Sequence, residues 1–270
     1  MNSPYNRIVI LFPFSMLLVV FIAGALLTGC AQESGQGEAE PDRETLYQVS
    51  TLGALKAGFY DGDVSYTELE KRGDVGIGTF EGLDGEMIAL DGAFYQIKND
   101  GKVYEVSGSA LAPFAMITFF DADLVTQPGG GLNYQELQAY LDTELPSPNI
   151  FYAIKIEGRF DHVQARSVPA QEKPYPPLSE AIANQAVFEL DDVEGTMVGF
   201  WCPAYVGDIN APGYHLHFIT ADCGAGGHVL DLRLGEVTVF IDETPDFLMQ
   251  LPEMEEFQQA DLEPSSQPSP

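Results

Sequence analysis

Three of the four histidines in this chain lie within one short window. His215 and His217 belong to the run GYHLHF (residues 213–218), whose aromatic and apolar residues favour a β-strand. Side chains two residues apart on a strand point to the same face, so these two imidazoles emerge together. The glycine-rich stretch that follows can turn the chain back and bring His228 beside them. Three neutral imidazoles on such a frame can ligate a divalent metal ion and leave positions open for water or substrate.

The balance of charge excludes one class of partner. The chain of 270 residues has 12 Lys and Arg against 41 Asp and Glu, a formal charge of −29. This charge repels the phosphate backbone of nucleic acids, so we expect no nucleic-acid partner. The apolar content of 45% is ordinary for a globular protein, and the length accommodates one large domain or two modest ones.

The N-terminal segment has the pattern of a secretory signal. Arg7 precedes an apolar run over residues 8–27, which ends in Leu-Thr-Gly-Cys at Cys30. A basic start, an apolar centre and a small-residue exit describe a signal peptide over residues 1–29, although a run of this length can also span a bilayer as an uncleaved anchor. The ending resembles the lipobox of bacterial lipoproteins, which implies cleavage before Cys30 and lipidation of its thiol. We therefore expect an extracytoplasmic protein, in the periplasm or at the cell surface, that meets a bacterial membrane only through its lipid anchor.

Composition also predicts the domain boundaries. Residues 30–44 form an acidic segment that cannot build a packed core and is expected to be a flexible tether. Residues 253–270 form an acidic tail rich in Pro and Ser. Between them, the polar, proline-rich stretch after residue 169 predicts a junction between an N-terminal lobe over residues 45–170 and a C-terminal metal-binding lobe over residues 171–252.

The folded part alternates short apolar runs with turns. Turns separate runs over residues 76–80, 83–90, 93–97 and 102–106, and the last two of these turns contain Asp-Gly, which predicts an antiparallel meander. Further strands are predicted at 115–120, 150–156, 163–168, 195–201, 214–220, 229–234 and 236–241, and helices at 66–72, 133–145 and 178–185. The prediction is a β-dominated, two-lobed α+β fold with mixed or antiparallel sheets and a few short helices.

The two cysteines that remain after lipidation of Cys30 leave alternatives open. An extracytoplasmic setting permits a disulfide between Cys202 and Cys223, and their separation in the sequence neither supports nor excludes it. Cys223 is alternatively a fourth ligand of the metal ion, although the glycine-rich loop around it gives no specific support.

Two further residues are candidates for chemistry. Glu86 follows a turn at the start of a strand, where its carboxylate can reach into a cleft, although an ordinary surface acid is also natural in so acidic a chain. Arg166 is one of few basic residues, and its apolar neighbours indicate a strand from which it can project inward. The planar guanidinium group binds two oxygens of a carboxylate at once, so Arg166 is a candidate for holding an anionic substrate.

Several ordered motifs, together with the histidine window, resemble those of bacterial alpha-acetolactate decarboxylases from about Leu46 to Pro252. They are LDGE (83–86), FYAI (151–154), VQAR (163–166), QEKPY (171–175), GTMVGF (195–200) and PAY (203–205). The resemblance implies that His215, His217 and His228 ligate Zn²⁺, that Glu86 is the strand glutamate of the active site and that Arg166 is its arginine. The family also brings a glutamate from the C-terminal tail over the metal, for which the candidates are Glu253, Glu255, Glu256 and Glu263.

The resemblance implies a function. It is the zinc-dependent decarboxylation of (S)-2-acetolactate to (R)-acetoin and CO₂, in which the metal stabilises an enediolate that is then protonated on one face. It also implies a homodimer. Two alternatives remain open, a cupin-like metal oxygenase or isomerase and a non-catalytic zinc-binding lipoprotein. Cupin-like sites also place two histidines on a strand but usually add a glutamate a few residues later, and none occurs between His217 and Cys223.

Overall fold

The computed structural model describes residues 41–262, which belong to one compact unit that begins at Pro41. The expected signal peptide, Cys30 with most of the tether, and residues 263–270 of the tail lie outside the described residues. Within residues 41–262, no helix is long and apolar enough to cross a membrane.

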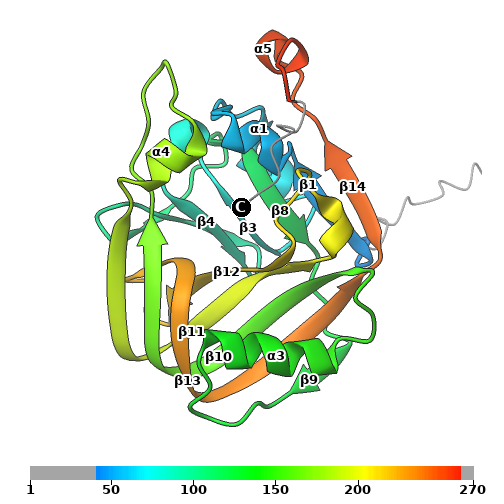
Figure 1. Ribbon diagram of the computed structural model, residues 1–270, viewed down its shortest axis with the longest axis vertical. Helices are drawn as coiled ribbons and strands as arrows, with labels where there is room; N and C mark the ends of the chain where they lie inside the picture. The colour runs from blue at the N-terminus through cyan, green and yellow to red at the C-terminus, as the bar shows by residue number, and fades with distance from the viewer. Residues whose placement is uncertain (1–40, 263–270) are drawn as a thin grey trace, which may run out of the picture. The chain divides into compact units, whose positions relative to one another are not determined.

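A seven-stranded sheet forms the first layer, in the order β14-β1-β8-β3-β4-β5-β6 (Figure 1). Its strands are β1 (Thr45–Val49), β3 (Val75–Thr79), β4 (Glu86–Leu90), β5 (Ala93–Ile97), β6 (Val103–Glu105), β8 (Phe114–Thr118) and β14 (Asp246–Gln250). Strands β3 to β6 pair antiparallel in sequence order, which confirms the predicted meander. Strand β14, which the sequence did not predict, pairs parallel with β1 and makes the sheet mixed.

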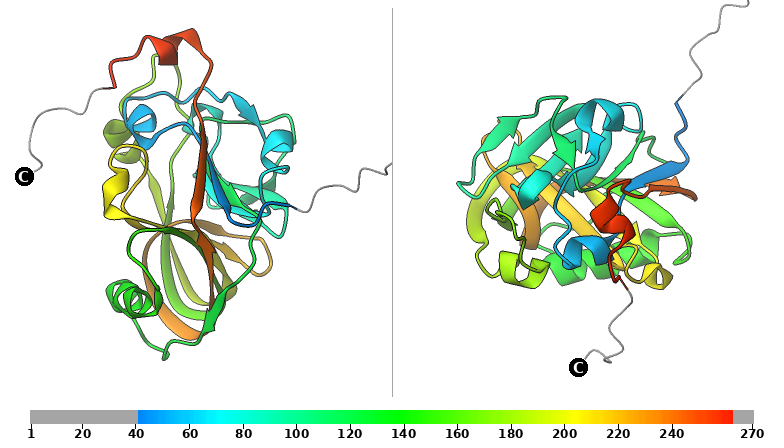
Figure 2. Two further views of the ribbon diagram at one scale, coloured as in Figure 1. Left: turned by 90° about the vertical axis from the view of Figure 1, so that its right-hand side faces the viewer. Right: turned by 90° about the horizontal axis from the view of Figure 1, so that it is seen from above.

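The second sheet is a barrel. Its strands are β9 (Leu124–Thr126), β10 (Phe151–Ser167), β11 (Ala186–Cys202), β12 (Gly213–Thr220) and β13 (Gly226–Thr244). Neighbouring strands are antiparallel, and β10 pairs with both β11 and β13, so that β10 to β13 close on themselves (Figures 1 and 2). The β-dominated α+β prediction with mixed and antiparallel sheets is therefore confirmed.

Two strand pairs predicted from the sequence are each a single long strand. The predicted strands at 150–156 and 163–168 are both parts of β10, which leaves out only their outer residues 150 and 168, and residues 229–234 and 236–241 both belong to β13. The register between β10 and β13 shifts between Gly158 and Phe160, where Gly158 has a φ of +142°. A bulge of this kind bends a strand without ending it, so a local break in the apolar pattern does not end the backbone pairing.

The helices are short. They are α1 (Leu52–Lys56), α2 (Tyr66–Leu69), α3 (Tyr134–Glu144), α4 (Leu178–Ile182) and α5 (Glu255–Gln258), with 3₁₀ turns at Glu81–Leu83 and Ala204–Val206 and a small ribbon of β2 (Val64–Ser65) and β7 (Leu111–Ala112). Helices α2, α3 and α4 were predicted, with ends that differ by a few residues. Helix α3 begins at a capping box, in which Asn133 accepts the backbone N–H of Glu136 and Glu136 accepts that of Asn133.

Three apolar clusters hold the layers together. One lies between the sheets and includes Ile77 and Ile88 of the first sheet with Phe200 of the barrel, and a second fills the barrel and is covered by α3. A third lies on the other face of the seven-stranded sheet, under α2. Strands β9 and β10 precede residue 170 yet belong to the barrel, and β14 returns to the first sheet. The division between the sheets along the chain therefore differs from the lobe boundary expected at residues 170 and 171.

The cysteines of the barrel lie at opposite ends of β11 and β12. Cys202 is buried and pairs with Gly213, whereas Cys223 is exposed beyond Thr220, which pairs with Gly195. Seven residues of strand span about 23 Å, far more than the Cα separation of a disulfide. Both thiols are free. A disulfide between them within one chain is excluded.

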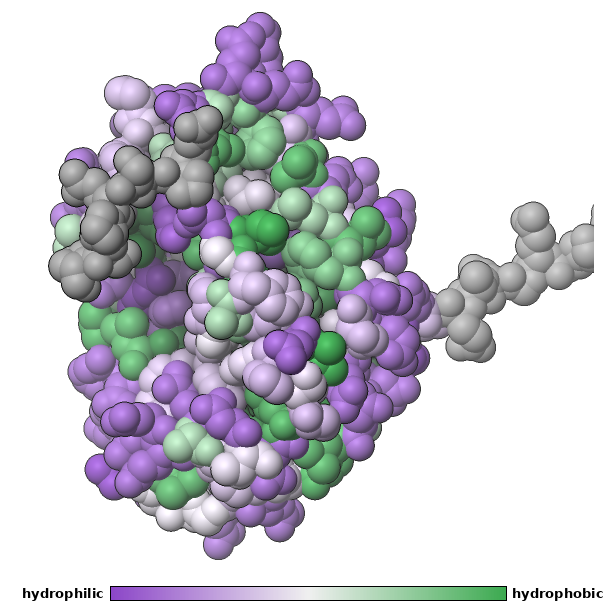
Figure 3. Space-filling model, turned by 45° about the vertical axis from the view of Figure 1, so that its right-hand side comes forward, coloured by the Kyte–Doolittle hydropathy of each residue, from purple (hydrophilic) through white to green (hydrophobic). Residues whose placement is uncertain are grey.

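The surface is polar over most of the face shown in Figure 3, as the acidic composition predicts, with hydrophobic side chains gathered across its upper half. Among the described residues, the exposed large apolar side chains are Tyr104, Val125, Val187, Tyr205, Ile209, Leu248 and Leu251.

Candidate active site

Strand register brings the three histidines of the sequence window together. His215 and His217 lie two residues apart on β12, and His217 pairs across the hairpin with His228 at the start of β13. Their ring centroids are 4.8 to 5.3 Å apart. Gly227 permits this approach, because a Cβ at that position, where φ is +146°, would lie 2.4 Å from the carbonyl oxygen of Arg166.

The histidines are held as neutral imidazoles. Burial lowers the pKa of His215 to about 4, with a further contribution from the Arg166 guanidinium, and lowers the pKa of His217 and His228 well below the usual value. His217 Nδ1 lies 2.8 Å from the backbone oxygen of Met87 and must donate to it. Nε2 of His217 therefore presents a lone pair, and within residues 41–262 this buried atom has no hydrogen-bond partner.

This group fits a divalent metal ion. Its ligand nitrogens lie within 4.8 Å of one another, and His215 Nε2 and His228 Nδ1 are 3.0 Å apart. Two nitrogens that each bind zinc at about 2.05 Å would be roughly 2.9 to 3.3 Å apart at octahedral to tetrahedral angles, so the closest pair already has the required separation. The orphaned Nε2 of His217 is the second observation in favour, because a buried lone pair without a donor is otherwise costly.

Arg166 and Glu86 lie beside the histidines and contact each other. Arg166 on β10 pairs in register with His228, and its Nη1 donates to Glu86 Oε1 at 3.4 Å. Glu86 comes from the first residue of β4, in the other sheet, and its Oε2 is 3.6 Å from His217 Nε2. Burial raises the pKa of Glu86, against the opposing effects of Arg166 and the backbone N–H of Val168. The structure therefore brings together the three histidines, Arg166 and Glu86, which the sequence predicts as the metal-binding and catalytic residues.

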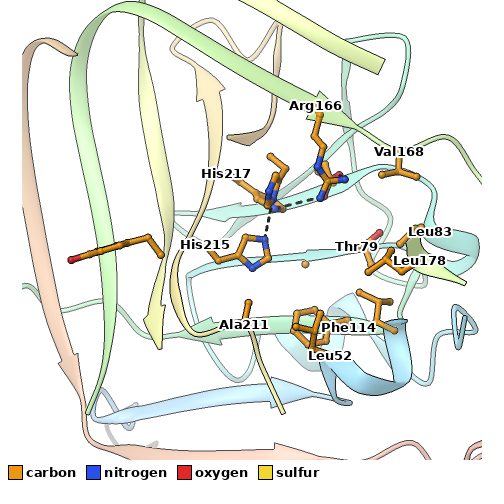
Figure 4. A pocket seen from close by; sticks show the side chains of 15 residues that line it. Leu52, Thr79, Leu83, Phe114, Arg166, Val168, Leu178, Ala211, His215 and His217 are labelled. Atoms are coloured by element: carbon orange, nitrogen blue, oxygen red, sulfur yellow. Dashed lines mark hydrogen bonds and ion pairs between the residues drawn. The ribbon is translucent and has the colours of Figure 1, made fainter. Parts of the chain in front are cut away.

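These five residues line one side of a pocket of about 220 Å³. Figure 4 shows Arg166, His217 and His215 on this side. The other lining side chains are mostly apolar. They come from α1, β8, α4, the 3₁₀ turn Glu81–Leu83, the residue after β10 and the segment before β12: Leu52, Leu55, Leu83, Phe114, Val168, Leu178 and Ala211, with Thr79 of β3 and Tyr214 of β12. A pocket with polar groups on one side and hydrocarbon on the other suits a small molecule that carries both oxygens and alkyl groups.

Sequence reasoning missed this apolar side of the pocket. Leu52 and Leu178 stand in short apolar segments with no motif of their own, whereas Leu83 belongs to the LDGE motif and Tyr214 adjoins His215. Among the tail glutamates, Glu253, Glu255 and Glu256 are exposed and do not line the pocket, whereas Glu263 lies outside the described residues. Cys223 is exposed on the loop after β12 and is not part of the histidine group.

Comparisons with known proteins agree on one family. A family model described as alpha-acetolactate decarboxylase matches residues 46–264. The chain is 52% identical over 219 residues to an alpha-acetolactate decarboxylase of Methanosarcina mazei. The matched region covers 81% of this chain and 76% of that relative. It is 42% identical over 232 residues to that of Bacillus subtilis, covering 86% and 91% of the two chains.

Solved structures give the same result for the fold. The crystal structure of alpha-acetolactate decarboxylase from Bacillus subtilis strain 168 matches with a TM-score of 0.80 at 43% sequence identity. The match covers 82% of this chain and 94% of that one, so the similarity includes both sheets.

Proposed function

The chain belongs to the alpha-acetolactate decarboxylase family, and we propose that it converts (S)-2-acetolactate into (R)-acetoin and CO₂ with a zinc ion held by His215, His217 and His228. Membership of the family makes the chain a carboxy-lyase, while the metal, the stereochemistry and the residue roles are the proposal. The observation that carries it is the convergence of three neutral imidazoles, a guanidinium and a buried carboxyl group on one side of a small pocket.

The reaction sets the requirements for the site. Breaking the bond between C1 and C2 releases CO₂ and moves the electron pair toward the C3 ketone, which leaves an enediolate. The enediolate then takes one proton at C2 to give acetoin. A bound zinc ion would supply Lewis-acid stabilisation of the negative charge that develops on the substrate oxygens.

Arg166 would orient the substrate through its oxygens. Its guanidinium is the charged cation among the residues that line the pocket, and the substrate is an anion. The side chain is only 14% exposed, so its charge acts in a site that excludes most water. Because Nη1 also donates to Glu86, the same guanidinium fixes the position of the carboxyl group relative to the bound substrate.

Glu86 would deliver the proton to C2. Burial favours the protonated form of the Glu86 carboxyl group. Because Glu86 belongs to β4, its side chain would reach a substrate in the pocket from the side of the seven-stranded sheet. Delivery from one direction would protonate one face of the enediolate and give a single enantiomer of acetoin. If a tail glutamate assists, Glu263 is the remaining candidate, because Glu253, Glu255 and Glu256 do not line the pocket.

The test supplies purified protein with racemic acetolactate, with and without a metal chelator, follows CO₂ release and resolves acetoin on a chiral column. The proposal expects one enantiomer, loss of turnover with the chelator and recovery on addition of Zn²⁺. Undiminished turnover by protein shown to be metal-free would contradict the role of zinc. Oxygen-dependent turnover with bound iron would instead support a cupin-like oxygenase. Tight metal binding without turnover would support a non-catalytic zinc-binding protein.

The remaining expectations extend this proposal. We propose a homodimer, which light scattering of the purified protein tests directly. We also propose that the chain is exported and lipidated at Cys30, so mass spectrometry of the mature N-terminus should find a diacylglycerol-modified cysteine. An intact N-terminus with an unmodified thiol would contradict this localisation.

A further inference from the structure

A pair of buried amide side chains lies behind the apolar side of the pocket. Gln48 on β1 and Asn210 before β12 are 0% and 1% exposed. Asn210 Nδ2 donates to Gln48 Oε1 at 2.6 Å and lies 2.9 Å from Met116 Sδ. Burying two amides is costly unless their polar atoms are satisfied, and here both oxygens and both nitrogens have partners.

The remaining bonds of the pair hold the backbone of two segments. Gln48 Nε2 donates to the carbonyl oxygens of Ser50 and Ile209 at 2.7 and 2.8 Å. Asn210 Oδ1 accepts the backbone N–H of Ala211 at 2.7 Å. Gln48 and Asn210 therefore join the segment that leads from β1 into α1 to the segment that leads into β12.

These two segments supply neighbouring parts of the pocket. Leu52 donates its backbone N–H to Ile209 and Gly53 donates its own to Asp208, so α1 and the segment before β12 are bonded side by side. Leu52 and Ala211 both line the pocket, as does Phe114, two residues from Met116 on β8. Figure 4 shows Leu52, Phe114 and Ala211 together, on the opposite side of the pocket from Arg166. We call these three residues the apolar wall.

The apolar wall faces the groups proposed to hold the substrate oxygens. A substrate held at its oxygens by Arg166 and the histidine side must direct its alkyl groups toward Leu52, Phe114 and Ala211. The separation between the two sides then decides how well the reacting carbon is held, and displacements of an ångström at such positions can change rates strongly. The wall consists of hydrocarbon, which cannot fix its own position by directed bonds, whereas the amide pair behind it makes directed bonds to the backbone on both sides.

We propose that Gln48 and Asn210 are positioning residues for catalysis, which set the distance between the apolar wall and the polar side of the pocket. The inference rests on the proposed function, because it concerns how the substrate of that reaction is held. The two amides touch neither the substrate nor the metal-binding histidines, and they act through the backbone of Ile209 and Ala211.

The test compares wild type, Asn210→Ala, Gln48→Ala, the double variant and a control, Thr118→Val. Thr118 is 0% exposed on β8 and donates to the backbone oxygen of Thr45, so the control removes a part-buried hydrogen bond between β1 and β8 without touching the pocket. Each zinc-loaded protein is assayed for kcat, KM and the midpoint of thermal unfolding. Binding of 2,3-dihydroxy-2-methylbutanoate, the unreactive diol related to the substrate, is measured by calorimetry.

We expect each single variant to raise KM and the Kd of the diol about tenfold, with a smaller change in kcat. A tenfold change is about what the loss of one buried hydrogen bond contributes. The double variant should raise KM no further than the worse single variant, because the two amides act as a unit. The control should lower the thermal midpoint and leave both constants unchanged. If Asn210→Ala does not fold, Asn210→Ser retains an oxygen for the N–H of Ala211 and should give an intermediate rise in Kd.

Unchanged KM and Kd in the Asn210 variants, or an equal rise in the Thr118→Val control, would overturn the inference and leave the pair a structural element only. A wild type without turnover would instead refute the proposed function. In that case the diol Kd values still decide whether Gln48 and Asn210 position the apolar wall.

Discussion

The two sheets contribute to the pocket in different ways. In the barrel, backbone pairing places Arg166, His228 and His217 in a row across β10, β13 and β12. The seven-stranded sheet contributes Glu86, whose position relative to that row depends on side-chain packing and on the bond from His217 to the Met87 carbonyl. Geometry within the barrel is therefore a matter of strand register, whereas geometry between the sheets is a matter of tertiary contact. Substitutions in the barrel should therefore affect metal binding, whereas substitutions in the seven-stranded sheet should affect proton transfer and leave the metal bound.

Removal of one histidine of the barrel row should have the largest effect. His217→Ala deletes the most buried imidazole of the group, and we expect loss of bound zinc and a fall in kcat/KM of more than about 10³-fold. The measurements are metal content by atomic emission and turnover of acetolactate. His162→Ala is the matched control, because His162 lies on β10 but pairs with Asp191 at the surface. Full activity of metal-free His217→Ala protein would contradict the assignment of metal binding to the histidines of the barrel.

Glu86→Gln tests the contribution of the other sheet. Because Glu86 is proposed as a proton donor and not as a ligand, kcat should fall about 10²- to 10⁴-fold while one zinc ion per chain remains bound. Glu105→Gln on β6, exposed in the same sheet, should leave both quantities unchanged. Loss of zinc from the Glu86 variant would make Glu86 a ligand, and the distinction between the two sheets would fail.

The pH dependence of stability tests a contact of Asp242 between the barrel and the segment that connects the two sheets. This buried residue of β13 accepts the backbone N–H of Asp121, in the connection from β8 to β9. Burial raises its pKa to about 7, so the folded state holds the proton more tightly than the unfolded chain, in which an Asp has a pKa near 3.9. The resulting stability is fully present below about pH 4 and is lost as pH rises through 7.

Asp242→Asn keeps an acceptor for Asp121 and removes the charge. At pH 8 the variant should be more stable than wild type by about 2–4 kcal/mol, and at pH 4 the difference should vanish. Urea unfolding at both pH values measures it, with the exposed Asp231→Asn on the same strand as control. A difference that does not depend on pH would show that folding does not raise the pKa of Asp242.

Thr79→Val should give the smallest effect. Thr79 Oγ1 donates to the backbone oxygen of Gly85 at 2.7 Å and so holds the turn that precedes Glu86. Valine has nearly the same shape without the donor, and we expect a loss of about 1 kcal/mol in stability and a modest fall in kcat with zinc retained. Thermal unfolding and steady-state kinetics measure the two effects, and Thr118→Val is again the control. An unchanged kcat would mean that this turn does not depend on the threonine.

The difference between the sheets also explains what the sequence could predict. His215, His217 and His228 were found from local spacing, because a strand and a hairpin carry residues to predictable faces. Glu86 and Arg166 were identified through the motifs that surround them, since no local rule places β4 against the barrel. The apolar wall was not predicted, because Leu52 and Ala211 meet only through bonds between distant segments.

The ends of the long strands were mispredicted for a related reason. The sequence breaks around Gly158 in β10 and Gly235 in β13 were interpreted as gaps between separate strands. Both strands continue through these positions because their neighbours in the closed barrel supply pairing partners on either side of the irregularity. A single-sequence pattern contains no information on those partners.

Strand β10 has a consequence for how the molecule folds. Phe151 at its start stacks against Phe247 of the seven-stranded sheet, and Arg166 near its end lies among the histidines of the barrel. A strand shared in this way cannot leave one layer without disturbing the other, so the two layers should unfold together in one cooperative transition. Amide hydrogens in the middle of β10 should then exchange with solvent only through global unfolding. Most of its partners are distant in sequence, so the catalytic pocket should be completed late in a comparatively slow folding reaction.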